Sequence, residues 1–425
     1  MLVLLAALQA VAADSGPVVT LRDALRAATR LDPGYVAAAG ALDNAEWGRR
    51  AAWSALVLPA VSLGAAYNWY STSGFNPVTF QPTDRLATAS IDARFDVFTG
   101  GQKVAALRRA QADIEAAEAG TLEARFALAL ATEADYYAVL ADEELARVAA
   151  ERVRRAEEQF LVARARVRSG AAVQTDSLQQ LLEVKRSRVA QLQQDAATRA
   201  ARFQLGRRVG LAGPARAAPL DTAAPPALPF TLEEAVRRAL AQGPAYRVAR
   251  ANERAAGADL QARRGAYLPR ATLAASIATY DERFFPEAQS RNQLTLTVSL
   301  PLWDGAQREM AMSRARVERD VARALRADLE RGAWRDVAEA YDAYNTSRAT
   351  AVLAAEALAV ARESYRVQQT RYRAGATTIL DLLDAQLALT TSEAALVQAT
   401  FGARLALAGL EATLGTRLDS SKDMP

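Results

Sequence analysis

The stretch Ala-Thr-Ala-Ser-Ile-Asp-Ala-Arg-Phe-Asp-Val at residues 87–97 alternates small or apolar side chains with polar ones. Such alternation is typical of a β-strand with one apolar and one polar face, and a tilted strand of this length can cross a bilayer core. Three other segments show the same period of two. The residues on their apolar face are Val61, Leu63, Ala65, Tyr67 and Trp69; Leu273, Ala275, Ile277 and, more weakly, Thr279; and Leu294, Leu296, Val298, Leu300 and Leu302.

A soluble hairpin that covers a core gives the same alternation, so the period alone leaves two interpretations open. Two further features favour a membrane. Four strands cannot close a barrel, and open strand edges are not tolerated in lipid, whereas three copies would supply twelve strands. The segments Ser71–Arg85 and Asp281–Arg291 are then predicted to be surface loops. Aromatic residues also lie at both ends of the strands, as at membrane interfaces: Tyr67, Trp69, Tyr70, Phe98 and Trp303.

Each predicted strand pair lies between two helical stretches. Those before the strands run over about residues 21–55 and 232–266, and those after them over about 102–167 and 307–372. About 65 residues of helix reach on the order of 100 Å, several times the diameter of a small domain. The long helices therefore predict a tube or a fibre.

A shorter helix follows each long one after a break, with residues at alternating four- and three-residue steps that are typical of coiled coils. An ordinary antiparallel coiled coil explains this pattern equally well, and the basic residues in it indicate a seam that is not fully dry. The positions are Leu178, Leu182, Lys185, Val189, Leu192, Ala196, Arg199 and Phe203, and then Leu383, Leu387, Thr390, Ala394, Val397, Phe401, Arg404 and Ala408.

Internal duplication explains why each feature occurs twice. Thr-Leu-Arg-Asp-Ala-Leu at residues 20–25 recurs as Thr-Leu-Glu-Glu-Ala-Val at 231–236, and Pro33 matches Pro244. An apolar N-terminus followed by small residues is typical of a secretory signal, and dense prolines indicate an extended linker. The predicted organisation is a signal peptide (1–13), a first repeat (14–210), a linker (211–230), a second repeat (231–415) and a tail (416–425).

Composition argues against an enzyme. The chain has no cysteine and no histidine, which removes nucleophilic thiols, the commonest general base and the commonest metal ligand. No cofactor or metal site is predicted. The net charge of +4 is small for 425 residues, and arginines alternate with acids along the helices. This pattern indicates solvated helical faces, and no nucleic-acid partner is expected.

These features together resemble the TolC-type outer-membrane efflux proteins. The resemblance rests on the duplicated order, the Leu-Pro entry to each strand pair at residues 58–59 and 268–269, and the exits Phe-Thr-Gly-Gly-Gln at 98–102 and Trp-Asp-Gly-Ala-Gln at 303–307. It implies a mixed α and β chain, mostly α, that forms one third of a trimeric 12-stranded transmembrane β-barrel continued by a long periplasmic α-helical barrel.

The resemblance also implies a function and partners. The chain would be the passive outer-membrane duct of a tripartite efflux or type I secretion system, located in the cell outer membrane and extending into the periplasm. It would work as a homotrimer in outer-membrane lipid, with a periplasmic adaptor (membrane fusion) protein and an inner-membrane pump. Whether the cargo is drugs, metals or proteins cannot be deduced from the residues.

In the resembling family the two helix breaks lie at the periplasmic tip. The resemblance assigns a gate to Asp381 and Asp384, with Tyr372 and Asp176 tying the closed tip together. Asp381 and Asp384 lie three residues apart on one helix face, so a trimer would place rings of carboxylates there. Helix capping explains Asp381 and Asp176 as well. The residues expected to contact the adaptor are Arg168, Ser169, Gly170, Arg373, Ala374, Gly375 and Thr377.

Thr377 departs from the resembling family, which has a basic gate-locking residue at this position. Two other interpretations of the whole chain stay open from the residues alone. One is a periplasmic adaptor of an export system, and the other is a coiled-coil scaffold. An adaptor has one central hairpin flanked by glycine-rich β modules, whereas this chain has two hairpins and a proline-rich linker. A scaffold would leave the four alternating segments unexplained.

Overall fold

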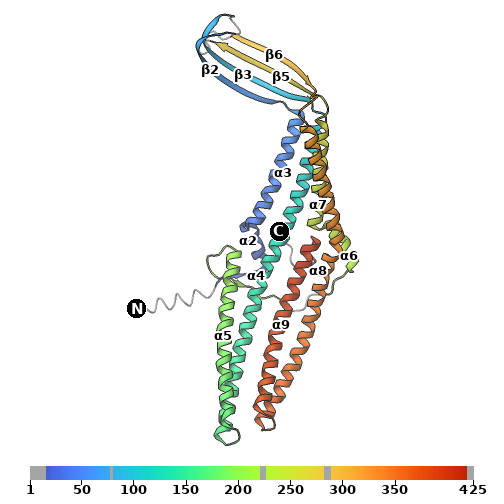
Figure 1. The fold of residues 1–425 in the computed structure, drawn as a ribbon. Helices are drawn as coiled ribbons and strands as arrows, with labels where there is room; N and C mark the ends of the chain where they lie inside the picture. Colours follow the sequence, from blue (N-terminus) through green and yellow to red (C-terminus); the bar gives the residue numbers. More distant parts are fainter. Residues whose placement is uncertain (1–15, 77–79, 221–225, 282–288, 419–425) are drawn as a thin grey trace, which may run out of the picture. The chain divides into compact units, whose positions relative to one another are not determined.

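The computed structural model describes residues 16–76, 80–220, 226–281 and 289–418 (Figure 1). The predicted signal peptide, most of the C-terminal tail and residues 221–225 of the linker lie outside the described residues. The chain divides into two compact units, each built from separate stretches of sequence. One unit comprises residues 1–38, 120–246 and 331–425, and the other comprises 39–119 and 247–330.

The order of helices and strands confirms the duplication (Figure 1). Two helices, two long strands, a very long helix and a shorter helix occur in this order in each half. The long helices each have 67 residues, as the sequence predicts to within one residue at either end. The first half contains α2 (Leu21–Leu31), α3 (Pro33–Val57), β2 (Ala60–Phe75), β3 (Pro82–Phe98), α4 (Gln102–Arg168) and α5 (Gln174–Arg208). The second contains α6 (Leu232–Gln242), α7 (Pro244–Gly265), β5 (Arg270–Asp281), β6 (Gln289–Ser299), α8 (Gln307–Arg373) and α9 (Ile379–Leu414).

The single helix predicted before each strand pair is wrong, because both are split into two. α2 ends at Leu31 and α3 begins at Pro33, with Asp32 in an extended conformation between them. A proline has no backbone N–H and disfavours helical geometry in the residue before it, so it is tolerated only at a helix start. Asp32 caps the new start by accepting a hydrogen bond from Tyr35 N at 2.9 Å. Pro244 splits α6 from α7 in the same way.

The four long strands form one antiparallel sheet in the order β2-β3-β5-β6, so the two repeats join through the β3–β5 pair. The register places Leu63, Ile91 and Ile277 opposite one another, and it confirms that the predicted apolar positions share one face. The bounds differ at both ends. β2 and β3 reach into the loop predicted at Ser71–Arg85, and β6 ends at Ser299, before Leu300 and Leu302.

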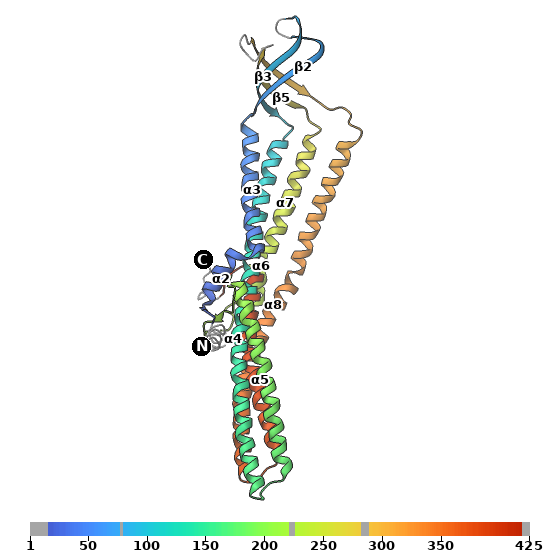
Figure 2. The ribbon, with the colours of Figure 1, turned by 90° about the vertical axis from the view of Figure 1, so that its left-hand side faces the viewer.

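In the unit that contains this sheet, parts of α3, α4, α7 and α8 run in a row (Figure 2). Ion pairs join neighbouring helices of the row. Arg109 of α4 contacts Asp259 of α7 at 2.9 Å, and Arg326 of α8 contacts Glu253 of α7. Within the described residues no ion pair joins α3 to its neighbour in the row, and none of the α3 residues is buried.

The other unit contains two antiparallel helical hairpins, α4 with α5 and α8 with α9 (Figure 1). Its core includes Leu25, Tyr136, Tyr137, Leu205 and Phe401. A small sheet completes it, in which β1 (Val18–Val19) pairs in parallel with β4 (Arg216–Ala217) from the predicted linker. The buried Tyr136 hydroxyl donates to Ala218 O at 2.8 Å, and burial raises the pKa of Tyr136 to about 12.

The heptad positions of α5 do not pack inside the chain, so the predicted coiled-coil seam is not formed between α5 and another helix of the same copy. Leu178, Leu182, Val189, Leu192 and Phe203 are 48–69% exposed. α4 packs on α5 instead through smaller or polar residues and ion pairs such as Arg152–Glu183 at 2.7 Å. The side chains of α5 that are buried are Gln180, Val184, Ser187, Thr198 and Leu205.

None of the described helices combines the length and the apolar character needed to cross a membrane.

A buried charge cluster fixes the end of α9 to α4. The fully buried carboxyl groups of Glu133 and Glu411 both accept from Arg417 Nη1, at 2.8 and 2.5 Å. Glu411 also accepts from Leu418 N at 2.8 Å. Removing one partner of such a cluster leaves buried charge without compensation, which is more costly than replacing the whole cluster.

We predict that Arg417→Ala lowers the free energy of unfolding by about 3 kcal/mol, because Glu133 and Glu411 lose their guanidinium. Urea denaturation of the purified chain, followed by circular dichroism, measures the effect. Arg366→Ala is the matched control, since its ion pair with Glu363 is largely exposed and should leave the midpoint unchanged. Equal midpoints for the two variants would contradict the prediction.

Candidate functional site

The sheet has two chemically different faces. On one face Leu63, Leu294 and Val298 are 79%, 72% and 66% exposed. A contiguous exposed apolar surface of this kind marks contact with a membrane or with another protein. On the other face Asp92 accepts from Ser90 Oγ at 2.8 Å and from Ser276 Oγ at 2.7 Å. One face is therefore suited to an apolar medium, and the other to water.

The helix breaks form two turns with the same geometry, one in each hairpin. Gly170 and Gly375 have φ values of +75° and +76°, a conformation that glycine adopts without steric cost. Ala171 N donates to Arg166 O at 2.9 Å and Gly170 N to Val167 O at 3.1 Å. This pair of bonds is the Schellman ending of a helix, and the second turn repeats it with Ala376 and Gly375 as donors.

Asp381 caps the start of α9. Its carboxylate accepts from Thr378 N at 3.0 Å and Thr378 Oγ1 at 2.7 Å, while Asp381 N donates back to Thr378 Oγ1. Thr377 Oγ1 donates to the same carboxylate at 2.8 Å. These bonds from Thr378 and then Thr377 lower the pKa of Asp381. The capping alternative is thus confirmed for Asp381, and Thr377 binds the acid on its own chain.

Asp384 lies one helical turn further on and is exposed. Its carboxylate makes no hydrogen bond or ion pair with the part of the chain that the structure describes. Leu382, which lies between the two acids in sequence, points to the inside of the hairpin. It is fully buried in a cluster that includes Tyr372, Ile379 and Leu389. A rigid helix start therefore presents Asp384 to solvent as an unpaired charge.

Tyr372 is buried beneath Arg166 of the other hairpin. The Arg166 guanidinium lies 4.6 Å from the centre of the Tyr372 ring, and Arg166 Nη1 donates to Tyr372 O. Arg166 Nη2 also donates to Ala171 O in its own turn at 3.2 Å. Among the described residues the Tyr372 hydroxyl has no hydrogen-bond partner. Burial raises the pKa of Tyr372, and the nearby charge of Asp176 raises it further.

The structure thus brings Tyr372 near Asp176 without a hydrogen bond between them. Asp176 is half-buried in the first turn of α5, behind Val173, which offers no side-chain cap. The residues expected to contact an adaptor, Arg168, Ser169, Gly170, Arg373, Ala374 and Gly375, are all exposed, and Thr377 is half-buried. Their roles stay predictions.

Sequence reasoning missed Arg166, which joins the two hairpin turns. It belongs to a stripe on α4 that faces the second hairpin. Arg155 pairs with Glu393 at 2.7 Å, Gln159 donates to Tyr365 OH at 3.4 Å, and Val162 packs on the cluster around Leu382. The spacing of 155, 159, 162 and 166 is itself a four-three-four pattern, which could have identified the stripe.

Solved outer-membrane channel proteins have the same fold. The outer membrane protein VceC from Vibrio cholerae superposes with a TM-score of 0.77 at 19% identity, covering 94% of this chain and 97% of VceC. CusC has a TM-score of 0.80 at 16% identity, covering 94% of each chain. The open state of the Neisseria gonorrhoeae MtrE channel has a TM-score of 0.77 at 18% identity, covering 95% of this chain and 91% of MtrE.

The sequence profile of the outer membrane efflux protein family matches residues 24–211 and 235–416, one match for each repeat, and the chain belongs to that family. The family and the fold are those of channel proteins and not of enzymes. Membership favours the channel over the adaptor or scaffold that the residues alone left open.

Two relatives match over part of their length. The outer membrane protein OprJ of Pseudomonas aeruginosa is 29% identical over 174 residues, which cover 40% of this chain and 36% of OprJ. Protein CyaE of Bordetella pertussis is 30% identical over 208 residues, which cover 48% of this chain and 44% of CyaE. The matched stretches therefore span about two fifths of each relative.

We predict that the first turn of α9 loses protection at low pH. The folded-state pKa of Asp381 lies below its unfolded value, so its stabilising effect is complete above the ordinary aspartate pKa of about 3.9 and disappears as the pH falls through the folded value. Hydrogen exchange of residues 379–382, corrected for intrinsic rates, measures the loss. In Asp381→Asn the pH dependence in this window should vanish; a persisting dependence would assign it to another group.

We also predict that Arg166→Ala loosens the contact between the two hairpin turns. The variant removes the bonds to Tyr372 O and Ala171 O and the stacking on Tyr372, so exchange of the amides at 371–376 should accelerate about tenfold, or 1.4 kcal/mol. Arg168→Ala is the control, because Arg168 is exposed on the same helix end. Equal exchange in both variants would show that Arg166 does not join the turns.

Proposed function

We propose that three copies of this chain form a passive export duct, with the sheets in the outer membrane and the helical hairpins in the periplasm. The proposal rests mainly on the four-stranded sheet. Its apolar face is exposed, and within the described residues the outer edges of β2 and β6 have no strand partner. Unpaired backbone groups are very costly in lipid. Pairing β6 of one copy with β2 of the next satisfies them, and three copies close twelve strands.

The exposed heptad face of α5 supports the same assembly. Leucine, valine and phenylalanine side chains at 3.5-residue spacing pack well against another helix, and α5 leaves them uncovered. A neighbouring copy supplies that helix in the proposed trimer. The polar sheet face, with Asp92 bonded to Ser90 and Ser276, then lines a water-filled lumen.

Within the duct we assign the narrowest point to the start of α9, where Asp381 and Asp384 would each form a ring of three carboxylates. The two acids have different roles in this proposal. Asp381 holds the helix start and is already hydrogen-bonded, whereas Asp384 has an unoccupied carboxylate that is free to attract cations. Arg166 and Tyr372 hold the two hairpin turns of each copy together, with Asp176 beside them.

The exposed turns 168–170 and 373–375 are the proposed docking sites of a periplasmic adaptor, which would connect the duct to an inner-membrane pump. The small residues Ser169, Gly170, Ala374 and Gly375 at these turns allow close approach of another helical hairpin. The pump would select the cargo, since the duct supplies a pathway and no binding chemistry specific to one substrate.

The test is to reconstitute the purified chain in planar bilayers. We expect a detergent-stable trimer and stepwise ion conductance. In Asp384→Asn the concentration of Mg²⁺ that halves the conductance should rise about tenfold, because the ring loses its charge. Glu356→Gln is the control, since Glu356 is an exposed acid of α8 that lies sixteen residues before Tyr372.

A monomer without conductance would overturn the duct. A conducting trimer whose Mg²⁺ block is the same in Asp384→Asn, Glu356→Gln and the parent chain would leave the duct intact and overturn the gate. Asp381→Asn separates the two acids further, because it also weakens the helix start.

A further inference from the structure

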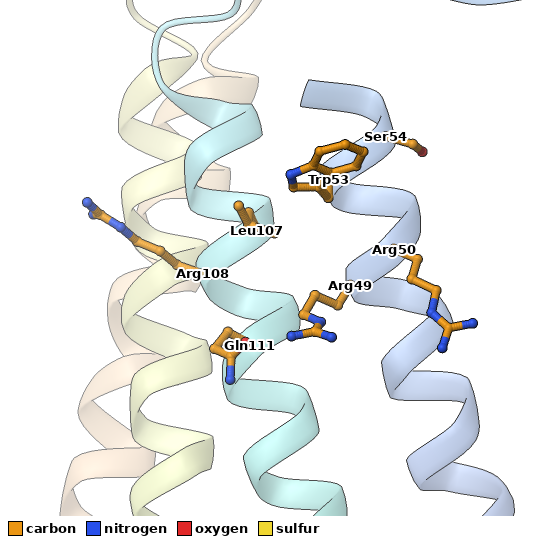
Figure 3. A pocket seen from close by; sticks show the side chains of 7 residues that line it. All are labelled: Arg49, Arg50, Trp53, Ser54, Leu107, Arg108 and Gln111. Atoms are coloured by element: carbon orange, nitrogen blue, oxygen red, sulfur yellow. The ribbon is translucent and has the colours of Figure 1, made fainter. Parts of the chain in front are cut away.

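A cleft of about 810 Å³ lies between α3 and α4, in the unit that contains the sheet (Figure 3). Trp53 and Arg49 of α3 point toward α4, and Leu107 and Gln111 of α4 also line the cleft. Arg50 and Ser54 point to the other side of α3, and Arg108 points away from α3. The space is large enough for a lipid headgroup with part of an acyl chain.

α3 leaves its large apolar residues uncovered. Trp47 and Trp53 are 65% and 55% exposed, and Val57 and Leu58 at the end of the helix are 44% and 56% exposed. Arg50 stacks on Trp47 at 4.8 Å. Trp53 has no such cover and faces the cleft. A tryptophan in this situation is typical of a boundary between an apolar and an aqueous medium.

The lining changes from apolar to polar along the cleft. Trp53 lies four residues before the end of α3, and Leu107 lies five residues after the start of α4. Both are therefore near the helix ends that connect to the sheet. Arg49 and Gln111 are each one helical turn further from the sheet, about 6 Å. Trp53 and Leu107 therefore line the side of the cleft near the strands, together with Ser54 and Arg108, and Arg49 and Gln111 line the far side.

Three arginines line this cleft, and Arg49 is the one that points toward α4 and has no partner among the described residues. Arg50 pairs with Glu46 at 3.5 Å, and Arg108 donates to Gln261 at 2.9 Å. Arg49 makes no hydrogen bond or ion pair with any residue that the structure describes. A guanidinium is always charged at neutral pH, and its planar donors match the oxygens of a phosphate.

We propose that this cleft binds a phospholipid of the periplasmic leaflet, with its phosphate on Arg49 and Gln111 and an acyl chain against Trp53 and Leu107. The proposal rests on the outer-membrane placement proposed above. In that placement the apolar sheet face lies in the hydrocarbon core, and the headgroup layer begins below Val57 and Leu58. Polar headgroups occupy about 5–8 Å on each side of the core, and the long side chain of Arg49 extends into that layer.

The order of the lining selects a lipid over other occupants. A free phosphate would use Arg49 and Gln111 alone and would leave Trp53 and Leu107 exposed. A second copy of the chain could cover Trp53 and offer Arg49 an exposed acid of α8 such as Glu318, and the experiment below separates this occupant from a lipid. A phospholipid can place its acyl chain against Trp53 and Leu107, on the side of the sheet, and its phosphate against Arg49 and Gln111.

The experiment titrates the full chain in detergent with phosphatidylglycerol and counts bound lipids by native mass spectrometry. We expect one saturable lipid per chain, with binding weakened about tenfold in Arg49→Ala and in Trp53→Ala. Arg50→Ala is the matched control and should bind as the parent chain does. A diacylglycerol of the same chain length should not saturate the site, and inorganic phosphate at millimolar concentration should not displace the phospholipid.

Several results would overturn the proposal. Equal weakening in Arg49→Ala and Arg50→Ala would indicate general surface charge. Displacement by inorganic phosphate would indicate a phosphate site. Absence of bound lipid from an assembled trimer that Arg49→Ala destabilises would show that a second copy fills the cleft.

Oligomeric state and conductance are measured on the same preparation, so that the lipid site and the duct are tested separately. A chain that conducts but lacks Arg49-dependent lipid binding overturns the lipid site alone. A chain that shows this binding but does not conduct overturns the duct alone.

Discussion

The unpaired backbone groups at the two edges of the four-stranded sheet are the main constraint on how this protein can be used in a membrane. Each strand interior to the sheet is paired on both sides, while β2 and β6 each present one unpaired edge within the described chain. In water such edges are tolerated, and in lipid they are not. In the proposed assembly the apolar face of the sheet lies in lipid, and further copies pair with the two edges. The exposed heptad face of α5 fits the same requirement in the helical part of the chain.

The two hairpins arise from one duplicated pattern and have turns of the same geometry, yet the helix starts after these turns are capped differently. Thr378 and Asp381 form a reciprocal cap at the start of α9, whereas the aligned position in the first repeat is Val173, which has no side-chain cap. A missing cap weakens a helix start by about 1 kcal/mol. Arg166 compensates at the other end of the turn by bonding to both hairpins. The second turn thus has a capped helix start, and the first has Arg166, which bonds both to its own turn and to the second hairpin.

Polar contacts hold the hairpins side by side. The stripe on α4 meets the second hairpin through the Arg155–Glu393 ion pair and the Gln159–Tyr365 hydrogen bond. Some buried amide atoms nearby, such as those of Gln180 and Gln386, have no partner in the described residues. Buried polar groups prefer defined partners and are costly when they lose them. Such a seam specifies how the hairpins align, and it contributes less cohesion than an apolar core of the same area.

The sequence by itself determined the duplication, the four strands around residues 61–69, 87–97, 273–279 and 294–302, and the two long helices. Each of these depends on local periodicity or on a repeated motif, which one stretch of chain contains in full. The last strand ends at Ser299 in the structure, and each long helix is one residue longer than predicted. Sequence reasoning missed the helix boundary at Pro33, although a proline is a local signal for such a boundary. The residue before it, Asp32, is extended in the structure.

Only the tertiary structure decided which side chains meet. Sequence reasoning assigned both Asp381 and Asp384 to a gate, and the fold separates them, because Thr377 and Thr378 bind one carboxylate and leave the other exposed. Nothing local indicates that Arg166 reaches Tyr372, 206 residues away. The α5 heptads are also ambiguous in sequence, since the same spacing fits a partner in the same chain or in another copy. Long-range contacts depend on how the helices align, and no single segment encodes that alignment.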